Sequence, residues 1–301
     1  MLIGAEGEAF DDPDYLYELK LDGVRCLAFA GDGETVLRNK RNLLVSPIYP
    51  ELAQLHKQVK GRCVLDGELV TLIDGRPRFS EIQRRALMSD PFKIKLAAAQ
   101  HPVSFTAFDL LYQDGEDLMN APLTERKERL SKAVKENGRI AVSRVIEGRG
   151  KALYALTEQQ GLEGVVAKKK DSLYYPGKRT KDWIKCKNLQ DDDFVVCGYI
   201  RKSEGVTSLV LGQYRDGGLV YKGHVTLGVS GPGFRRIEAA PRIAAPSFPV
   251  PGGSGNERAV WLEPELVCTV KYMEKTSGGG LRQPVFKGLR DDKAPDSCIE
   301  K

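Results

Sequence analysis

A lysine lies among acidic residues near the N-terminus, in the segment YELKLDGVR (17–25). If this segment is a β-strand, its side chains alternate, and Glu18, Lys20 and Asp22 share one polar face while the tyrosines and leucines form a core face. Gly23 follows, where the backbone can turn or let a ligand approach. Such a lysine either pairs with a neighbouring strand or acts as a nucleophile, and the rest of the chain must decide between these interpretations.

Other predicted strands also gather polar side chains on one face. Taken singly, each of these faces can be explained as the solvent-exposed face of an edge strand. Together they describe one pocket, with a nucleophile, carboxylates for a hard cation, cations for phosphates and an aromatic ring for a base. The residues concerned are Asp66 and Glu68 in VLDGELV, Phe108 in FTAFDLLY, Glu163 in GLEGVVAKK, and Lys185 and Lys187 in DWIKCK.

The chemistry that fits these parts is attack by lysine on phosphorus. The attacking amine must be unprotonated, so the lysine pKa, about 10.4 in the free side chain, must be lowered. Neighbouring lysines, a divalent cation and burial all act in that direction. Glu163 and Glu68 are oxygen ligands suited to Mg²⁺ or Mn²⁺, or to the ribose hydroxyls.

Six segments extend this pattern along almost the whole chain. In order and spacing they resemble the motifs of the covalent nucleotidyltransferases, and above all those of bacterial ATP-dependent DNA ligases of the end-joining and repair type. The segments are KLDGVR (20–25), LDGELV (65–70), FDLLY (108–112), EGVVAK (163–168), WIKCK (183–187) and FKGLRDDK (286–293).

The resemblance implies an α+β protein with two domains. Residues 1–190 would form a mixed α/β nucleotidyltransferase domain of ATP-grasp-like fold, in which adenylation takes place. Residues 191–301 would form a small antiparallel OB-fold barrel. The composition changes near 188–193, after which short predicted strands are separated by glycines.

The resemblance also implies roles for individual residues. Lys20 would become adenylated by ATP, Glu18 would contact the adenine edge and Phe108 would stack on the ring. Arg25 and Glu68 would serve the ribose and the DNA 5′-phosphate. Glu163, with Glu68, would bind the metal, and Asp22 would support the nucleophile or that metal. The expected phosphate contacts are Lys185, Lys187, Arg179, Arg41 (with Arg38 as its rival) and, on the barrel, Arg290 and Lys293 of the sequence R-x-D-K that includes Asp292.

Local patterns predict the elements that position these residues. A hairpin is expected around Gly31-Asp32-Gly33, and a second strand pair turns at Asp74-Gly75. Helices are expected over 49–60, 79–87, 124–136 with Thr124 as a cap, 150–161 and about 231–239. Further strands are expected at 103–112, 163–169, 182–187 and, after the boundary, 194–202, 208–214, 219–228 and 259–273.

Composition narrows the class of protein. The 301 residues carry a net charge of +5, and the six cysteines form no C-x-x-C pair, which argues against a zinc ribbon or a disulfide framework. No run of about 18 apolar residues exists, and the N-terminus lacks the pattern of a secretory signal. We therefore expect a cytoplasmic monomer, used at the nucleoid. The basic segment 166–187 is interpreted as a phosphate-facing groove, with a solvated surface as the alternative.

The expected activity is the sealing of nicks or breaks in duplex DNA through a lysyl-AMP intermediate, as a step of repair. The enzyme alternatives are an RNA ligase and a GTP-dependent capping nucleotidyltransferase, and the contexts of LDGELV and FKGLRDDK favour a DNA ligase. A nucleic-acid-binding protein with a degenerate catalytic domain is a further alternative. The presence of Lys20, Glu163, Lys185 and Lys187 argues against it. The chain has no room for an N-terminal helical DNA-binding domain, so engagement of DNA would depend on the two domains or on a DNA-end-binding partner.

Overall fold

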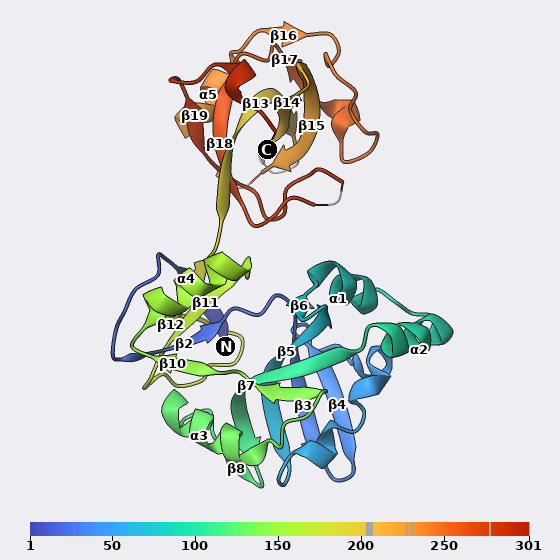
Figure 1. Ribbon diagram of the computed structural model, residues 1–301, viewed down its shortest axis with the longest axis vertical. Coiled ribbons are helices and arrows are strands. Elements are labelled where there is room, and N and C mark those ends of the chain that lie inside the picture. The colour runs from blue at the N-terminus through green and yellow to red at the C-terminus, as the bar shows by residue number, and fades with distance from the viewer. Residues whose placement is uncertain (203–206, 227, 230, 277, 301) are drawn as a thin grey trace. The chain divides into compact units, whose positions relative to one another are not determined.

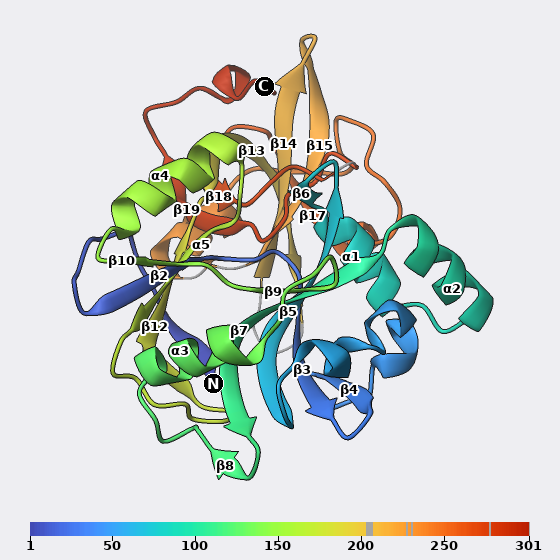
Figure 2. The same ribbon diagram turned by 60° about the horizontal axis from the view of Figure 1, so that its bottom comes forward.

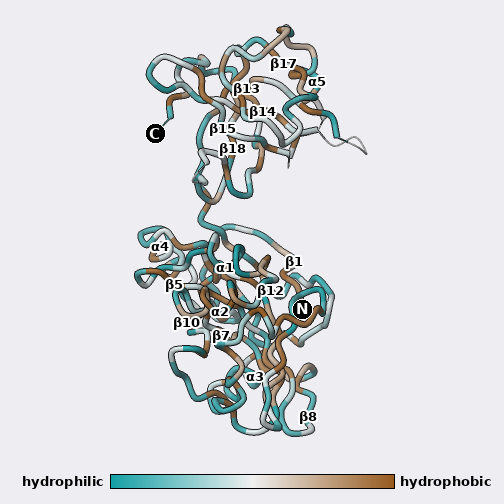
Figure 3. The backbone as a smooth tube through the Cα atoms, turned by 90° about the vertical axis from the view of Figure 1, so that its right-hand side faces the viewer, coloured by the Kyte–Doolittle hydropathy of each residue, from teal (hydrophilic) through white to brown (hydrophobic). Residues whose placement is uncertain are grey.

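The arrangement of strands and helices is given by a computed structural model, which describes residues 1–202, 207–226, 228–229, 231–276 and 278–300. The chain divides into two units, Met1–Asn188 and Leu189–Lys301, drawn in Figure 1. Within the described residues, no helix is long and apolar enough to cross a membrane. Hydrophobic segments run through the interior of each unit, and hydrophilic segments occupy many of the outer turns (Figure 3).

The first sheet of the first unit carries the predicted nucleophile. Its strand order is β1-β12-β11-β2-β10, with β1 parallel to β12 and the other neighbours antiparallel. Helix α4 (Gly150–Gln160) packs on it through Leu153, which shares a buried cluster with Tyr17, Val165 and Ala167. The strands are β1 (Leu2–Glu6), β2 (Tyr15–Leu19), β10 (Val145–Glu147), β11 (Gly164–Lys169) and β12 (Arg179–Lys187).

The second sheet supplies the remaining walls of the site. Its order is β4-β3-β5-β7-β8, and β5 and β7 lie side by side in Figures 1 and 2. The predicted hairpin between β3 and β4 is present, with Asp32 and Gly33 at positive φ of 50° and 82°. The strands are β3 (Val24–Gly31), β4 (Glu34–Asn39), β5 (Cys63–Ile73), β6 (Arg76–Pro77, on β5), β7 (Val103–Gln113), β8 (Glu116–Asp117) and β9 (Ile140–Val142, parallel to β7).

The helices of this unit agree with the predictions in part. Helices α1 (Phe79–Ala86) and α3 (Leu123–Ala133) were predicted, whereas α2 (Pro91–Gln100) was not. The signal for α2 was Asp90, whose carboxylate accepts hydrogen bonds from the first amides of the helix. Thr124 is not a cap, because the helix begins at Leu123 after Pro122 and the Thr124 amide donates to the carbonyl of Lys170.

The helix predicted over 49–60 is wrong. The segment forms two 3₁₀ turns, η2 (Pro50–Leu52) and η3 (Leu55–Gln58), which follow a third, η1 (Ser46–Ile48). Its buried residues Tyr49, Leu52 and Leu55 recur every three positions, which matches the period of a 3₁₀ helix better than that of an α-helix. The predicted core face of β2 is also only partly correct, since Leu19 is 37% exposed and Glu18 is buried.

The second unit is built on one seven-stranded antiparallel sheet. The long strand β13 pairs with β14 on one side and with β17 and β18 on the other, in the order β15-β14-β13-β17-β16, and β19 extends the sheet from β18. The strand expected over 259–273 is divided at Glu263–Leu266, where Pro264 interrupts the pairing. The elements are β13 (Gln190–Arg201), β14 (Thr207–Arg215), β15 (Gly218–Val225), α5 (Gly231–Glu238), β16 (Arg242–Ile243), η5 (Asn256–Arg258), β17 (Val260–Leu262), β18 (Val267–Tyr272), β19 (Val285–Arg290) and η6 (Pro295–Ser297).

Candidate active site

Lys20 directly follows β2 and faces a carboxylate from another strand. Its amide donates to the carbonyl of Gly164 over 2.8 Å, which holds this part of the chain against β11. Its Nζ lies 2.5 Å from Oε1 of Glu163, and the two side chains are 19% and 4% exposed. Three residues later only glycine fits, because a Cβ at Gly23 would come within 2.2 Å of the carbonyl oxygen of Leu69.

A cavity of about 130 Å³ surrounds the side chain of Lys20. Five predicted site residues line it, namely Glu18, Lys20, Arg25, Glu68 and Phe108, so both sheets contribute. The other lining residues received no role from the sequence, although Leu21, Val166, Lys168 and Trp183 lie within the motifs; most of them are apolar. They are Ile3, Leu19, Leu21, Ser143, Val166, Lys168 and Trp183.

Arg25, on β3, is held in the wall of this cavity by Asp66 and Tyr174. Its Nε and Nη2 donate to the carboxylate of Asp66 over 2.9 and 2.5 Å, and the hydroxyl of Tyr174 donates to the same carboxylate over 2.8 Å. The guanidinium also lies 5.4 Å from the centre of the Phe108 ring. Burial would lower the pKa of Arg25, but Asp66 outweighs that effect and raises it, so the cation is fixed beside the cavity.

Glu18 is more deeply buried than its predicted role required. Its side chain is 2% exposed, and its Oε1 lies 2.7 Å from Nζ of Lys127 and 2.8 Å from Nζ of Lys168. Burial alone would raise the pKa of Glu18, but the two lysines hold it below its ordinary value. Lys127 comes from α3, outside all six motifs, and the sequence gave no signal for this contact.

Glu68 and Glu163 differ in their surroundings, although both were predicted as metal ligands. Burial raises the pKa of Glu68 to about 8, so at neutral pH this carboxyl is mostly protonated and suits a hydroxyl group better than a cation. Within the described residues, no three His, Cys, Asp or Glu side chains form a ready-made metal site. Magnesium is often held by one or two carboxylates together with substrate phosphates, and Glu163, already beside a cation, fits that mode.

Lys185 and Lys187, on β12, face an acidic residue that the sequence did not connect with them. Oε2 of Glu6 lies 2.9 Å from Nζ of Lys185 and 3.9 Å from Nζ of Lys187. The parallel pairing of β1 with β12 places Glu6 opposite Lys185. Burial lowers the pKa of Lys187. The two lysines therefore already bind one anionic group.

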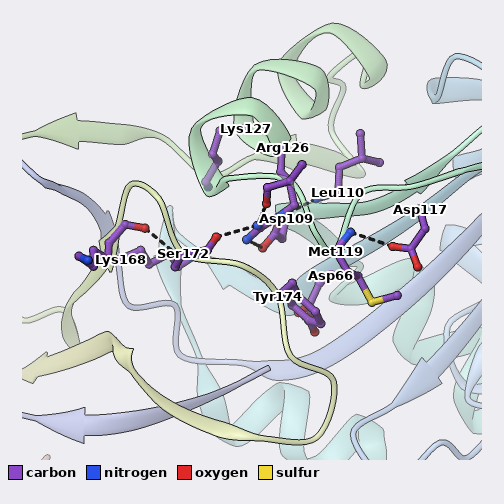
Figure 4. A network of polar contacts seen from close by, with 12 residues as sticks. Asp66, Asp109, Leu110, Asp117, Met119, Arg126, Lys127, Lys168, Ser172 and Tyr174 are labelled. Carbon is purple, nitrogen blue, oxygen red and sulfur yellow. Dashed lines mark hydrogen bonds and ion pairs between the residues drawn. The ribbon is translucent and has the colours of Figure 1, made fainter.

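A buried network of polar contacts lies next to Tyr174 (Figure 4). The carboxylate of Asp109 accepts two hydrogen bonds from Arg126, over 2.8 and 3.0 Å, and neither side chain is exposed. Arg126 also donates to the carbonyl of Ser172 over 2.9 Å. Strand β7, helix α3 and the segment that carries Tyr174 are thereby joined, which fixes β7, the strand that places Phe108 in the wall of the cavity.

None of the predicted phosphate contacts of the first unit lines this cavity; besides Lys185 and Lys187, these are Arg41, its rival Arg38, and Arg179. Arg41 is exposed in the turn after β4, and its amide donates to the side chain of Asn39. Arg38, its rival, donates to the carbonyl of Asn42, and Arg179 donates to the carbonyl of Ile3.

The predicted residues of the second unit form a cluster of ion pairs within that unit. Arg290 binds Asp292 through two nitrogens, over 2.7 and 2.6 Å. Arg290 also lies 3.5 Å from Asp193 of β13, and Lys293 pairs with the same carboxylate. The segment that follows β19 is thus attached to β13.

The chain matches two protein families. Residues 6–187 match the family described as "ATP dependent DNA ligase domain", and residues 202–293 match the "ATP dependent DNA ligase C terminal region". The first match covers all predicted site residues of the first unit, and the second includes Arg290 and Lys293.

Individual relatives and a solved structure agree with these families. The chain is 33% identical over 300 residues to the multifunctional non-homologous end joining DNA repair protein LigD of Mycobacterium tuberculosis, covering 95% of this chain but only 37% of that protein. It is 31% identical to the SPbeta prophage-derived DNA ligase-like protein LigB of Bacillus subtilis, covering 96% and 98% of the two chains. A structure of mycobacterial DNA ligase D complexed with ATP and MES is 31% identical, with a TM-score of 0.55 and coverage of 99% and 97%.

Proposed function

The chain belongs to the ATP-dependent DNA ligase family, and on that premise we propose that it seals nicks or breaks in duplex DNA through a lysyl-AMP intermediate on Lys20. ATP is the nucleotide that the family uses. The observation that carries the proposal is the position of Lys20, which contacts the carboxylate of Glu163 and lines a cavity together with the arginine of its own motif and the glutamate and phenylalanine of two other motifs.

The reaction would proceed in three steps. Nζ of Lys20 attacks the α-phosphorus of ATP, a phosphoramidate bond forms, and the bond to pyrophosphate breaks. A DNA 5′-phosphate oxygen then attacks the same phosphorus, which transfers AMP to the DNA and restores the amine. Finally the 3′-hydroxyl attacks the activated 5′-phosphorus, and AMP leaves.

The base and ribose would bind within the cavity. Phe108 offers its ring for stacking, and Glu18 offers a carboxylate oxygen to the adenine edge. Arg25, fixed by Asp66, would hold the ribose or the DNA 5′-phosphate, and the raised pKa of Glu68 suits a hydrogen bond with a ribose hydroxyl.

The phosphates would lie against β12. Lys185 and Lys187 would hold the α-phosphate in place of Glu6, and Glu163 would hold a divalent cation, Mg²⁺ or Mn²⁺. Such a cation neutralises charge on the phosphates as pyrophosphate leaves. Arg41 and Arg179 would contact phosphate only after their side chains leave the positions described above.

We assign the adenylation domain to residues 1–190 and an OB-fold domain to residues 191–301. The antiparallel sheet around β13 supports the second assignment. Arg290 and Lys293 would orient pyrophosphate in the first step. The chain spans little more than a third of its LigD relative, so action in repair, as a monomer with a DNA-end-binding partner, is part of this proposal.

Labelled nucleotides test the proposed activity. The protein is incubated with α-labelled ATP or GTP and Mg²⁺, and the label that stays on the denatured protein is measured. We expect label from ATP, none from GTP, and sealing of a nicked duplex DNA. The K132R variant, at an exposed lysine of α3, should label normally. Label from GTP would favour the capping alternative, and sealing confined to RNA would favour an RNA ligase.

A further inference from the structure

One buried charge cluster beside the cavity includes a residue to which neither the motifs nor the proposed function assigns a role. Lys127 of α3, Glu18 of β2 and Lys168 of β11 meet there, and both ammonium groups approach the same oxygen of Glu18. Their side chains are 9%, 2% and 4% exposed. A buried lysine is held at such a position only when its charge is matched, so this contact is specific.

The two lysines of the cluster are not equivalent. Nζ of Lys168 lies 4.5 Å from the centre of the Phe108 ring and 4.4 Å from that of Trp183, so its charge is shared with two aromatic faces. Burial lowers the pKa of Lys168 to about 8. Lys127 has no such aromatic contact among the described residues, and the charge of Glu18 therefore depends most on Lys127.

The second oxygen of Glu18 is a buried acceptor beside the cavity, and a donor group on a bound ligand would pair it. Glu18 lines the cavity, and its Oε2 has no hydrogen-bond partner within the part of the chain that the structure describes. An ionised carboxylate only accepts hydrogen bonds, whereas a protonated one also donates. The charge state of Glu18 thus decides which group on a purine the cavity can take.

We propose that Lys127 is a positioning residue that sets nucleobase choice, because it keeps Glu18 an ionised acceptor that binds the 6-amino group of adenine and repels the 6-carbonyl of guanine or hypoxanthine. This inference rests on the proposed function, in which the cavity holds the base of ATP. A buried acceptor that loses its donor is left unpaired, and sites of this kind discriminate strongly.

The test compares ATP with inosine triphosphate (ITP), which differs from it by the 6-carbonyl. The kcat and KM for labelling of the protein are measured for wild type, K127M, K127R and the matched control K132M on the same helix. We expect the ATP-to-ITP ratio of kcat/KM to fall at least about tenfold in K127M, mainly through a higher KM for ATP. K127R, which keeps the positive charge, should show a ratio close to that of wild type, and K132M should show the wild-type ratio.

The pH profile separates a role through Glu18 from a merely structural one. The charged groups that face this cluster are Lys127, Lys168 and, acting on Lys168, Asp109 of β7. Without Lys127, the carboxylate of Glu18 takes up a proton more readily. The ATP-to-ITP ratio of kcat/KM should therefore fall further from pH 8 to pH 6 in K127M, while the same ratio stays constant in wild type. The losses in the ATP-to-ITP ratio caused by E18Q and by K127M should also be non-additive in the double variant.

An equal loss of ATP and ITP use in K127M, with an unchanged ratio and pH profile, would overturn this inference and leave the proposed function intact. Additive losses in the E18Q/K127M double variant would overturn it as well. Wild-type protein that labels with neither nucleotide would contradict the proposed function, and this inference with it.

Discussion

The amine of Lys20 and the carboxylate of Glu163 lie 2.5 Å apart, and the side chain of Glu163 is almost fully buried. This contact engages the amine that must attack phosphorus. If Glu163 binds a divalent cation that arrives with ATP, the same event both releases the amine and neutralises the phosphates. One contact then couples cation binding to activation of the nucleophile.

Replacement of Glu163 by glutamine should slow adenylation roughly 100-fold. The amide keeps the shape of the side chain but binds Mg²⁺ weakly, so the Mg²⁺ titration of the remaining activity should move to higher concentration. The rate of label uptake at several Mg²⁺ concentrations measures this. E158Q, at an exposed position of α4, is the matched control. An unchanged titration curve would mean that the cation is held elsewhere.

The K20R variant should take up no AMP, because arginine does not lose its proton near neutral pH. Sealing of a nick that already carries AMP should be retained in part, since that step does not use the amine. Both assays are run on the same preparation. Label on K20R protein would end the assignment of Lys20 as the nucleophile.

Removing the charge of Glu6 should strengthen ATP binding. The carboxylate of Glu6 occupies the place at Lys185 and Lys187 that we assign to the α-phosphate, so the nucleotide must displace it. Partly exposed ion pairs contribute about 0.2–1 kcal/mol, which corresponds to a fall in KM for ATP of up to about fivefold in E6Q, with kcat unchanged. E8Q, at an exposed position nearby, should match wild type. A rise in KM would show instead that Glu6 positions the lysines productively.

The strands that carry the site could be predicted because their side chains alternate and glycines mark their ends. Lys20, Glu68 and Phe108 were each identified from the pattern of one strand, Arg25 was identified only through the family resemblance, and the cavity brings the four together. The 3₁₀ turns of 46–58 were missed because Leu52 and Leu55 also fit a helical period, and only packing against the sheet distinguishes the two.

The partners of the charged residues could not be predicted from the sequence. Glu18 meets Lys127 from a helix more than a hundred residues away, and Lys185 meets Glu6 from a strand that had no distinct signal. Such pairs depend on strand order and register, which local patterns do not contain. The turn that directs Arg41 away from the cavity is likewise set by a side-chain hydrogen bond of Asn39.

Glu300 should stabilise the second unit in a pH-dependent way. It pairs with Arg215 over 2.6 Å and with the buried Lys222, which lower the pKa of its carboxyl from 4.5 to about 2. A lowered acid pKa means that this stabilisation is complete above about pH 4.5 and is lost as the pH falls toward 2. E300Q should therefore lower the free energy of unfolding by about 1–2 kcal/mol at pH 7 and by progressively less below pH 4.5. Chemical unfolding of both proteins between pH 7 and pH 3 measures the difference, and a gap that does not shrink with acid would contradict it.

The last prediction concerns Arg290 and Lys293. A charged C-terminal segment is usually a solvated tail, but here β19 pairs with β18 and both cations bind Asp193. Their charges suit the pyrophosphate that leaves in the first step, a group absent from the later ones. The R290A/K293A variant should therefore lose most self-adenylation by ATP and still seal a nick that already carries AMP. R258A, which removes an exposed cation elsewhere in the same unit, is the control. Equal loss in both assays would assign these residues a structural role, and no loss in either would remove them from the mechanism.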